Sequence, residues 1–395
     1  MPVHILPTLA TIPPYVFSEL ERRKQAARAA GHDFLDLGIG SPDQPPPALV
    51  IEALREAALT APMNPYPPFR GSPRLLTAAA GFMSARFGVT FDPEREIVAL
   101  AGSKEGIAEL LSTLCGPGDT VLAPALSYPV YLRAPLMHGA DVHLVPMDPA
   151  RSWQLDLESI PAEVLTRARV LIANYPNNPT GAVTTLAGMA ELVEFARRHD
   201  LVLLHDLAYS ELTYDGHVAP SVFEVPGARD VAVEFHSCSK SFNMAGMRVG
   251  FVAGRADALD ALLAYRANVG YGVSMPIQHA AAYALDNVRT LLPPIVATYR
   301  ERRDVLYDTL RGLGWDVTPP QAAMYAWLPL PDGLEPWDAV QRVLMDGQVM
   351  ITPGLAFGDA GARWFRVSLI APAEALRAAA VRMAQVLDHS AAGVR

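Results

Sequence analysis

A lysine and an arginine near the middle of the chain stand where they could bind and react with a ligand. Lys240 lies in the segment Ser-Cys-Ser-Lys-Ser-Phe-Asn, which begins at Ser237 and follows the apolar run Val231–Phe235. Proteins with alternating strands and helices bind ligands beyond the carboxyl ends of their strands. An uncharged lysine amine there can form a Schiff base with an aldehyde. Arg248, a little further on, could hold a phosphate through two parallel hydrogen bonds. Without their neighbours, both would be interpreted as ordinary surface residues.

Asp206 and Tyr209 follow the apolar run Leu201–His205 in the segment Asp-Leu-Ala-Tyr. A carboxylate at the end of a buried strand can keep a pyridine nitrogen protonated, which makes the ring an electron acceptor. Tyr209 could reach a phenolic oxygen of the same ligand. The alternative is that Asp206 caps the N-terminus of a helix, a position that aspartate favours.

Two further segments are candidate ligand contacts. The loop Asn-Tyr-Pro-Asn-Asn-Pro-Thr-Gly begins at Asn174, and a plain turn does not explain its two asparagines before Pro179. Ser103 and Lys104 lie in Ala-Gly-Ser-Lys-Glu-Gly, directly before the apolar face of a predicted helix. The free N–H groups and the dipole at a helix N-terminus attract phosphate, although many helices begin with Gly-Ser and bind nothing.

Short apolar runs that alternate with predicted helices indicate the elements that position these motifs. They are Val121–Ala125, Val142–Pro146, Val170–Asn174, Leu201–Asp206, Val231–Ser237 and Val249–Ala253. These runs lack apolar/polar alternation, which is typical of strands buried on both faces. We therefore expect an α/β fold with a mainly parallel sheet.

The C-terminal part has the pattern of a smaller α+β domain. A helix is predicted from Ile295 to about Leu313, after the pair Pro293-Pro294. A strand through Met324–Leu328 and a last helix from about Ala373 to Leu387 follow.

The length of 395 residues is sufficient for two packed domains. We expect a large domain of residues 41–290 and a small domain of residues 1–40 with 291–395. A net charge of −9, with scattered Lys and Arg, argues against nucleic acid and anionic lipid as partners.

Only two cysteines occur, which excludes a disulfide framework and a cysteine-based zinc site, and we expect no metal. The chain opens on no signal-peptide pattern and has no long uninterrupted apolar run, so we expect a soluble, cytoplasmic protein without membrane contact.

These motifs, in this order, resemble those of the fold-type-I pyridoxal-phosphate (PLP) aminotransferases of class I and II. The resemblance extends from Leu37 to Ser368 and implies a mainly parallel seven-stranded sheet in a large domain. It implies that Lys240 holds PLP as a Schiff base, with Asp206 at the pyridine nitrogen. The other positions that it assigns to the cofactor are Tyr209, Asn178, Tyr128, Ser103, Lys104, Ser237 and Arg248. Gly40, Asn178 and Arg366 match groups that hold the substrate.

Within this family, the amino-acid sequences of the motifs resemble those of one branch, the succinyl-diaminopimelate, LL-diaminopimelate and alanine aminotransferases. Cys238 and Met247 depart from that branch, where a bulkier residue and a tryptophan are expected, and both could reshape the pocket. The resemblance implies a diaminopimelate or succinyl-diaminopimelate donor and 2-oxoglutarate as acceptor. Alanine or aspartate aminotransferase is an alternative, and a PLP-dependent C–S β-lyase is another.

The resemblance also implies a mechanism and an assembly. Lys240 would release the cofactor to the amino acid and then act as the base for its Cα proton. The proline-rich segment Asn64–Gly71 resembles a family segment whose tyrosine reaches the neighbouring subunit's cofactor phosphate. This implies a homodimer in which Tyr66 completes the partner's site.

A regulatory protein with the same fold would carry a helix-turn-helix module, and the residues before Leu35 show no such pattern.

Overall fold

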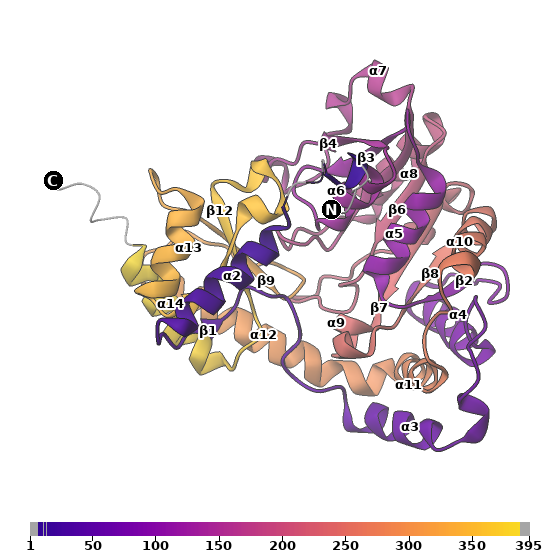
Figure 1. Cartoon of the computed structure of the whole chain (residues 1–395), viewed down its shortest axis with the longest axis horizontal. Helices are drawn as coiled ribbons and strands as arrows, with labels where there is room; N and C mark the ends of the chain where they lie inside the picture. The colour runs from indigo at the N-terminus through magenta and orange to yellow at the C-terminus, as the bar shows by residue number, and fades with distance from the viewer. Residues whose placement is uncertain (1–6, 11, 13, 388–395) are drawn as a thin grey trace, which may run out of the picture.

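The computed structural model describes residues 7–10, 12 and 14–387. A seven-stranded sheet forms the centre of the larger part (Figure 1). Its strands, in spatial order, are β2 (Ile97–Leu100), β8 (Gly250–Gly254), β7 (Ala232–Ser237), β6 (Val202–Asp206), β5 (Ala168–Ala173), β3 (Thr120–Pro124) and β4 (Asp141–Val145). Neighbouring strands from β7 to β4 are parallel, and β8 is antiparallel to both of its neighbours. The predicted mainly parallel α/β sheet is confirmed.

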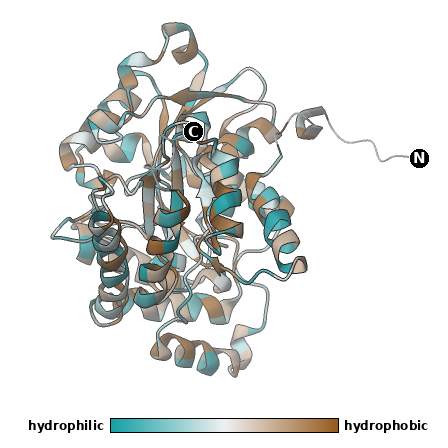
Figure 2. Ribbon diagram, turned by 90° about the vertical axis from the view of Figure 1, so that its left-hand side faces the viewer, coloured by the Kyte–Doolittle hydropathy of each residue, from teal (hydrophilic) through white to brown (hydrophobic). Residues whose placement is uncertain are grey.

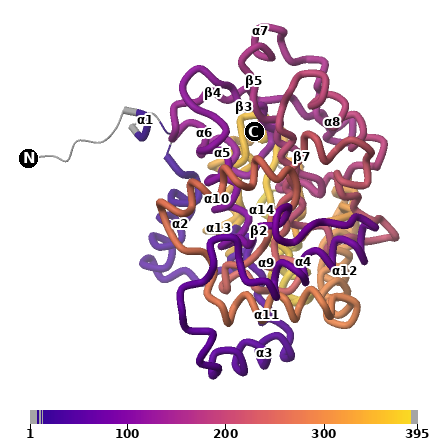
Figure 3. The backbone as a smooth tube through the Cα atoms, turned by 90° about the vertical axis from the view of Figure 1, so that its right-hand side faces the viewer, coloured from indigo at the N-terminus to yellow at the C-terminus, as the bar shows by residue number. Residues whose placement is uncertain are grey.

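Helices cover both faces of this sheet, which explains why most of its strands are largely apolar and lack apolar/polar alternation. On one face, α5 (Ser103–Leu114), α6 (Val130–Met137) and α10 (Ala256–Val269) share a buried cluster with the strands. On the other face, α4 (Pro73–Phe87), α8 (Leu186–Arg198) and α11 (Met275–Asp286) do the same. Figure 2 shows the hydrophobic residues along the strands and the hydrophilic ones on the outer faces of the helices. Helix α3 (Ala48–Ala58) packs beside α11 (Figure 3).

The smaller part has its own hydrophobic cluster and two small sheets. One contains β11 (Thr352–Pro353), β12 (Trp364–Ser368) and β9 (Tyr325–Pro329); the other pairs β1 (Leu35–Asp36) with β10 (Val349–Met350). The helices α2 (Val16–Ala29), α13 (Pro336–Met345) and α14 (Ala373–Val386) pack there, together with part of α12 (Val288–Gly312). The pairing of β1 with β10 supports joining the N-terminal residues to the C-terminal part, although the domain boundaries stay a prediction.

Helix α12 (Val288–Gly312) joins the two parts, and its predicted start is wrong. It begins at Val288 and contains both Pro293 and Pro294. Each proline removes one backbone N–H donor, so the helix lacks two of its internal hydrogen bonds. Buried side chains such as Leu291 and Ile295 stabilise this turn by packing on either side of the prolines.

The remaining sequence predictions lie close to the observed elements. Each of the six predicted strands, the strand after α12 and the last helix have observed bounds within two residues of the predicted ones. Strand β2 was not predicted, because four apolar residues also fit a buried helix segment. Within the described residues, no helix is long and apolar enough to cross a membrane.

Candidate active site

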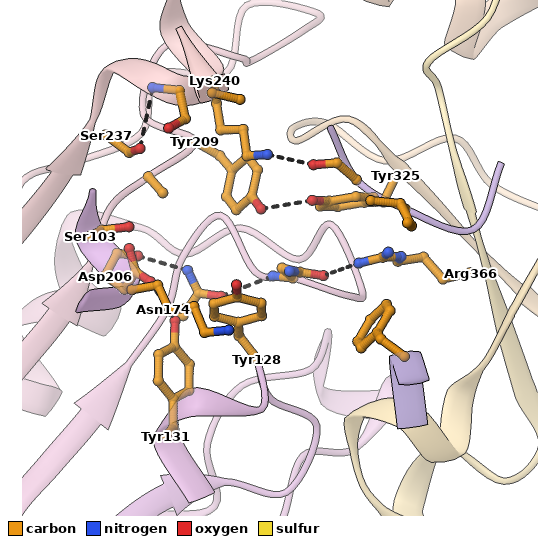
Figure 4. Close-up of a pocket in the computed structure, with 18 of the residues that line it drawn as sticks. Ser103, Tyr128, Tyr131, Asn174, Asp206, Tyr209, Ser237, Lys240, Tyr325 and Arg366 are labelled. Atoms are coloured by element: carbon orange, nitrogen blue, oxygen red, sulfur yellow. Dashed lines mark hydrogen bonds between the residues drawn. The ribbon is translucent and has the colours of Figure 1, made fainter. Parts of the chain in front are cut away.

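A cavity of about 290 Å³ lies where the carboxyl ends of β5, β6 and β7 face the smaller part of the molecule (Figure 4). Eleven of the twelve predicted site residues line it; Tyr66 does not. Ser103, Asp206 and Ser237 lie on one side, and Arg366 lies on the opposite side. The structure therefore gathers residues that are spread from Gly40 to Arg366 in the sequence.

Lys240 follows β7 in the short helix α9 (Cys238–Ser241). Its Nζ donates a hydrogen bond to the carbonyl oxygen of Gly40 at 2.5 Å. Burial lowers the pKa of Lys240, and the charges of Arg366 and Arg248 lower it further, against the opposing effect of Tyr325. A lowered pKa increases the fraction of uncharged amine, which is the form that attacks an aldehyde or accepts a proton.

Asp206 is the last residue of β6, and its carboxyl group faces the cavity. Its Oδ2 accepts a hydrogen bond from the hydroxyl of Tyr131 at 2.6 Å. Its Oδ1 is buried and has no hydrogen-bond partner among the described residues. Burial raises the pKa of Asp206, and the Tyr131 hydrogen bond opposes this. Residues 208–211, which follow Asp206, form a turn and not a helix, so the helix-cap interpretation is wrong.

We call residues Asn174–Gly181 the asparagine loop. Hydrogen bonds connect this loop to Asp206 on one side and to Arg366 on the other. Asn174 Nδ2 donates to the backbone oxygen of Asp206 at 2.7 Å, and Asn174 Oδ1 accepts from the backbone N–H of Asn178 at 2.9 Å. Asn178 Oδ1 then accepts from Arg366 Nη1 at 2.9 Å. Asn177 closes the turn by accepting hydrogen bonds from Thr180. Asn178 therefore has a role that a plain turn lacks, whereas Asn177 stabilises the turn itself.

Arg366 comes from β12 of the smaller part and is only 2% exposed. Its Nη2 donates to the Gly38 oxygen at 2.8 Å, and its Nε has no partner among the described residues. The guanidinium lies over the ring of Tyr325, 4.3 Å from its centroid. Burial lowers the pKa of Arg366. A buried guanidinium with an unpaired donor is suited to bind a carboxylate.

The opposite end of the cavity is suited to bind phosphate. Ser103 is the first residue of α5, whose N-terminal N–H groups favour an anion. The Ser237 side chain and the Arg248 guanidinium border the same cavity. Gly102 has a φ of +89°, and a Cβ atom there would lie 2.5 Å from Arg248 Nη2. Glycine at this position lets the arginine approach the helix.

The side chain of Lys104 lies beside two tyrosine rings. Its Nζ lies 5.4 Å from the ring centroid of Tyr15 and 5.8 Å from that of Tyr128. It makes no ion pair with any residue in the described ranges. Tyr66 is 77% exposed and stacks on Tyr271, so it contributes nothing to the cavity of its own chain.

Several residues that line the cavity were not predicted from the sequence. Tyr131 lies three residues after Tyr128, at the start of α6, and this nearness in the sequence was the available signal. The hydroxyl of Tyr325 is 2.9 Å from that of Tyr209. Tyr325 belongs to β9, far along the sequence, and no local sequence pattern indicates that it reaches the cavity.

The sequence profile of the family described as aminotransferase class I and II matches residues 32–382. The chain belongs to this family. The aminotransferase is 43% identical over 376 residues to an LL-diaminopimelate aminotransferase of Desulforudis audaxviator, covering 95% of this chain and 96% of that protein.

Solved structures show the same fold. The substrate-bound BacF structure from Bacillus subtilis superposes with a TM-score of 0.94 at 33% identity, covering 98% of this chain and 100% of that one. A probable N-succinyldiaminopimelate aminotransferase from Thermus thermophilus gives a TM-score of 0.88 at 35% identity, with 94% and 100% covered.

The enzyme is a fold-type-I, PLP-dependent aminotransferase that acts on an amino acid and a 2-oxo acid. The residues that line the cavity also fit this cofactor chemically. The unpaired Oδ1 of Asp206 can accept a hydrogen bond from a protonated ring nitrogen. The N-terminus of α5 suits a phosphate, and Lys240 suits an aldehyde.

Proposed function

We propose that this aminotransferase takes diaminopimelate or its N-succinyl derivative as amino donor and 2-oxoglutarate as acceptor. The similarity to proteins named LL-diaminopimelate and N-succinyldiaminopimelate aminotransferases supports the donor. The observation in the structure that carries the proposal is the position of Lys104. Its ammonium is a second cation in the cavity wall besides Arg366 that could receive a carboxylate, since Lys240 and Arg248 serve the cofactor.

Each proposed substrate carries a carboxylate at both ends, and we assign the two ends to different cations. Arg366, with Asn178 and Gly40, binds the α-carboxylate, because a guanidinium fork matches a carboxylate in two hydrogen bonds. Lys104 binds the distal carboxylate. This arrangement explains how one cavity accepts both the donor and 2-oxoglutarate.

We assign the cofactor contacts as follows. PLP supplies an aldehyde that condenses with amines and a ring that accepts electrons from the substrate's Cα. Asp206 would hold a proton at the ring nitrogen, and Tyr131 fixes the orientation of its carboxylate. Tyr128 would lie against the ring, while Asn178 and Tyr209 would contact its phenolic oxygen. Ser103, the backbone of Lys104, Ser237 and Arg248 would bind the phosphate.

Lys240 moves the proton that transamination requires. As an uncharged amine, its Nζ takes the proton from the substrate's Cα. Arg366 orients that Cα, because it fixes the carboxylate attached to it. Burial of the cavity walls limits the access of water and strengthens these charge interactions.

We infer that the active unit is a homodimer and expect it in the cytoplasm. Tyr66 and Tyr271 stack on one another at the surface and expose 77% and 51% of their area, and Val269 beside them exposes 59%. Such an apolar patch is typical of an interface. A second copy would bury it and bring Tyr66 to the partner's cofactor phosphate.

The experiment that tests the substrate is a panel of amino donors and oxo acids on the purified enzyme. We expect the highest kcat/KM for a diaminopimelate with 2-oxoglutarate. Replacing Lys104 by Met should raise KM for diaminopimelate and 2-oxoglutarate, and should leave KM for alanine and pyruvate unchanged. Higher kcat/KM for alanine would refute the proposed donor. Release of ammonia and pyruvate without an oxo acid would instead indicate the β-lyase.

A further inference from the structure

Behind the active site lies a buried polar cluster that lines no part of the cavity. We call it the Glu234 cluster, and its members are Glu234, His205, His236 and Ser221. Glu234, His205 and Ser221 have no exposed surface, and His236 is 3% exposed. His205 on β6 pairs with Glu234 on β7, so these two side chains share one face of the sheet. Asp206, the next residue of β6, points to the other face.

Glu234 receives four hydrogen-bond donors. Its Oε1 accepts from Ser221 Oγ at 2.8 Å and lies 2.9 Å from His236 Nε2. Its Oε2 accepts from the Val222 N–H at 2.8 Å and lies 2.9 Å from His205 Nδ1. A carboxylate has about four acceptor positions, and all of them are filled. Burial alone would raise the pKa of Glu234, but the two histidine hydrogen bonds outweigh it and lower the pKa to about 2.

This arrangement fixes the protons of His205. Its Nδ1 faces the Glu234 carboxylate, and its Nε2 faces the backbone oxygen of Tyr175 at 3.2 Å. Both partners can only accept a hydrogen bond. A neutral imidazole has one proton and would set a lone pair against one of these oxygens inside the protein. His205 therefore carries both protons and forms a buried ion pair with Glu234.

The position of this cation links it to the catalytic side of the sheet. Through Tyr175, His205 holds the asparagine loop, whose Asn174 bonds the backbone of Asp206. Burial raises the pKa of Asp206. The hydrogen bonds from Tyr131 and from the backbone of Ala208 lower it, and so do the charges of His205 and His236. Tyr128 and Tyr209 face Asp206 as neutral phenols, because burial raises the pKa of both.

We propose that His205, held as an imidazolium by Glu234, is a positioning residue that keeps Asp206 ionised for the cofactor ring and anchors the asparagine loop. This inference rests on the role assigned to Asp206 above. Burial opposes the ionisation of Asp206, and a positive charge one residue away reduces the free energy that ionisation requires.

The first test needs neither cofactor nor substrate. The protein contains ten histidines. With ¹⁵N-labelled histidine in the cofactor-free wild type near neutral pH, NMR should show one ring with a proton on both nitrogens, the state that the two acceptor partners of His205 require. His205→Gln should remove that signal, and His138→Gln should leave it in place. A wild-type His205 ring with a proton on only one nitrogen would overturn the proposal.

The second test measures affinity for PLP against pH. In His205→Gln, the pH below which PLP affinity declines should move upward by about one unit, which corresponds to a tenfold change in affinity on the acid side. Glu234→Gln should shift it in the same direction, so the result does not depend on one variant folding. His138→Gln is the matched control, and we expect no shift. A purely structural role would instead reduce PLP affinity by the same factor at every pH, and that result contradicts the proposal.

A third variant separates this inference from the proposed role of Asp206. In Asp206→Asn, which has no carboxyl group to titrate, adding His205→Gln should produce no further pH shift. If Asp206→Asn binds PLP like the wild type, the role of Asp206 is wrong and so is the link to it, while the NMR result still reports the charge of His205. A pH shift in the double variant would show that His205 acts through another group.

Discussion

At the scale of single residues, the site combines groups whose charge states differ from their ordinary ones. Burial lowers the pKa of Lys240 and raises that of Asp206, so each is brought closer to neutrality by the same enclosed cavity. For Lys240 this assists the reaction, since the free amine is the reactive form. For Asp206 it opposes the reaction, since only the carboxylate can hold a proton on the ring nitrogen. The hydrogen bond from Tyr131 partly restores the ionised form.

Replacing Lys240 by Ala should remove turnover while the fold persists. Loss of a positioned base lowers rates by about 10²–10⁴-fold, and the variant also loses its covalent link to PLP. The measurements are transamination rate, circular dichroism and retention of PLP on dialysis. Activity equal to the wild type would exclude Lys240 from the reaction.

Asp206→Asn should lower the transamination rate but raise the stability of the cofactor-free protein. Loss of a charge partner in the site typically lowers the rate by about 10²–10³-fold. The pKa of Asp206 is raised in the folded protein, so the folded state binds that proton more tightly than the unfolded state. Ionisation of Asp206 therefore lowers the free energy of unfolding as the pH rises through the folded pKa.

Asparagine avoids this loss and can still accept the Tyr131 hydrogen bond. The cofactor-free variant should melt at a higher temperature than the wild type near neutral pH. That advantage should disappear as the pH falls towards about 4, the ordinary pKa of aspartate. A lower Tm than the wild type at neutral pH would show that Asp206 stabilises the empty cavity.

Arg366→Lys should mainly weaken substrate binding. A single ammonium cannot reproduce the two hydrogen bonds of a guanidinium fork, and Asn178 and Gly38 would lose donors as well. We expect KM to rise for both the amino acid and the oxo acid in steady-state kinetics. An unchanged KM for both substrates would remove Arg366 from the site.

At the scale of elements, the carboxyl ends of the parallel strands place the reactive residues, and one helix N-terminus places the phosphate. Most strands could be predicted from the sequence because a strand buried on both faces is a continuous apolar run. The start of α12 could not, since prolines usually mark a helix boundary and only tertiary packing overrides them here. Tyr325 and Arg366 come from strands of another sheet, and only the fold shows that they meet over one cavity.

Gly102→Ala tests whether the start of α5 binds the cofactor phosphate. The added Cβ would meet the Arg248 guanidinium, and a φ of +89° is strained for alanine. We expect affinity for PLP to fall about tenfold, the effect of losing about 1.4 kcal/mol of binding free energy. Gly116→Ala is the control, because its Cβ would meet nothing within 4 Å and its φ is outside the strained range. Equal PLP affinity in both variants would place the phosphate elsewhere.

At the scale of the whole molecule, the cavity lies between two parts of one chain, and we propose that a second chain completes it. Arg366 from the smaller part bonds to Asn178 of the larger part, so their relative position sets the substrate anchor. Tyr66 is the predicted site residue that lies outside the cavity, and it is held at the surface by Tyr271. The segment Asn64–Gly71 predicts a site that two subunits share, and a single chain contains only one half of such a site.

Subunit mixing tests this sharing directly. In a homodimer, two-fold symmetry gives two equivalent sites, each with Lys240 from one chain and Tyr66 from the other. Inactive Lys240→Ala subunits mixed with weakened Tyr66→Phe subunits should form heterodimers in which one site has both native residues. Activity for each site that retains Lys240 should then exceed that of the Tyr66→Phe homodimer after the subunits exchange. Sedimentation of a fully active monomer, or exchange without any gain in activity, would show that each chain works alone.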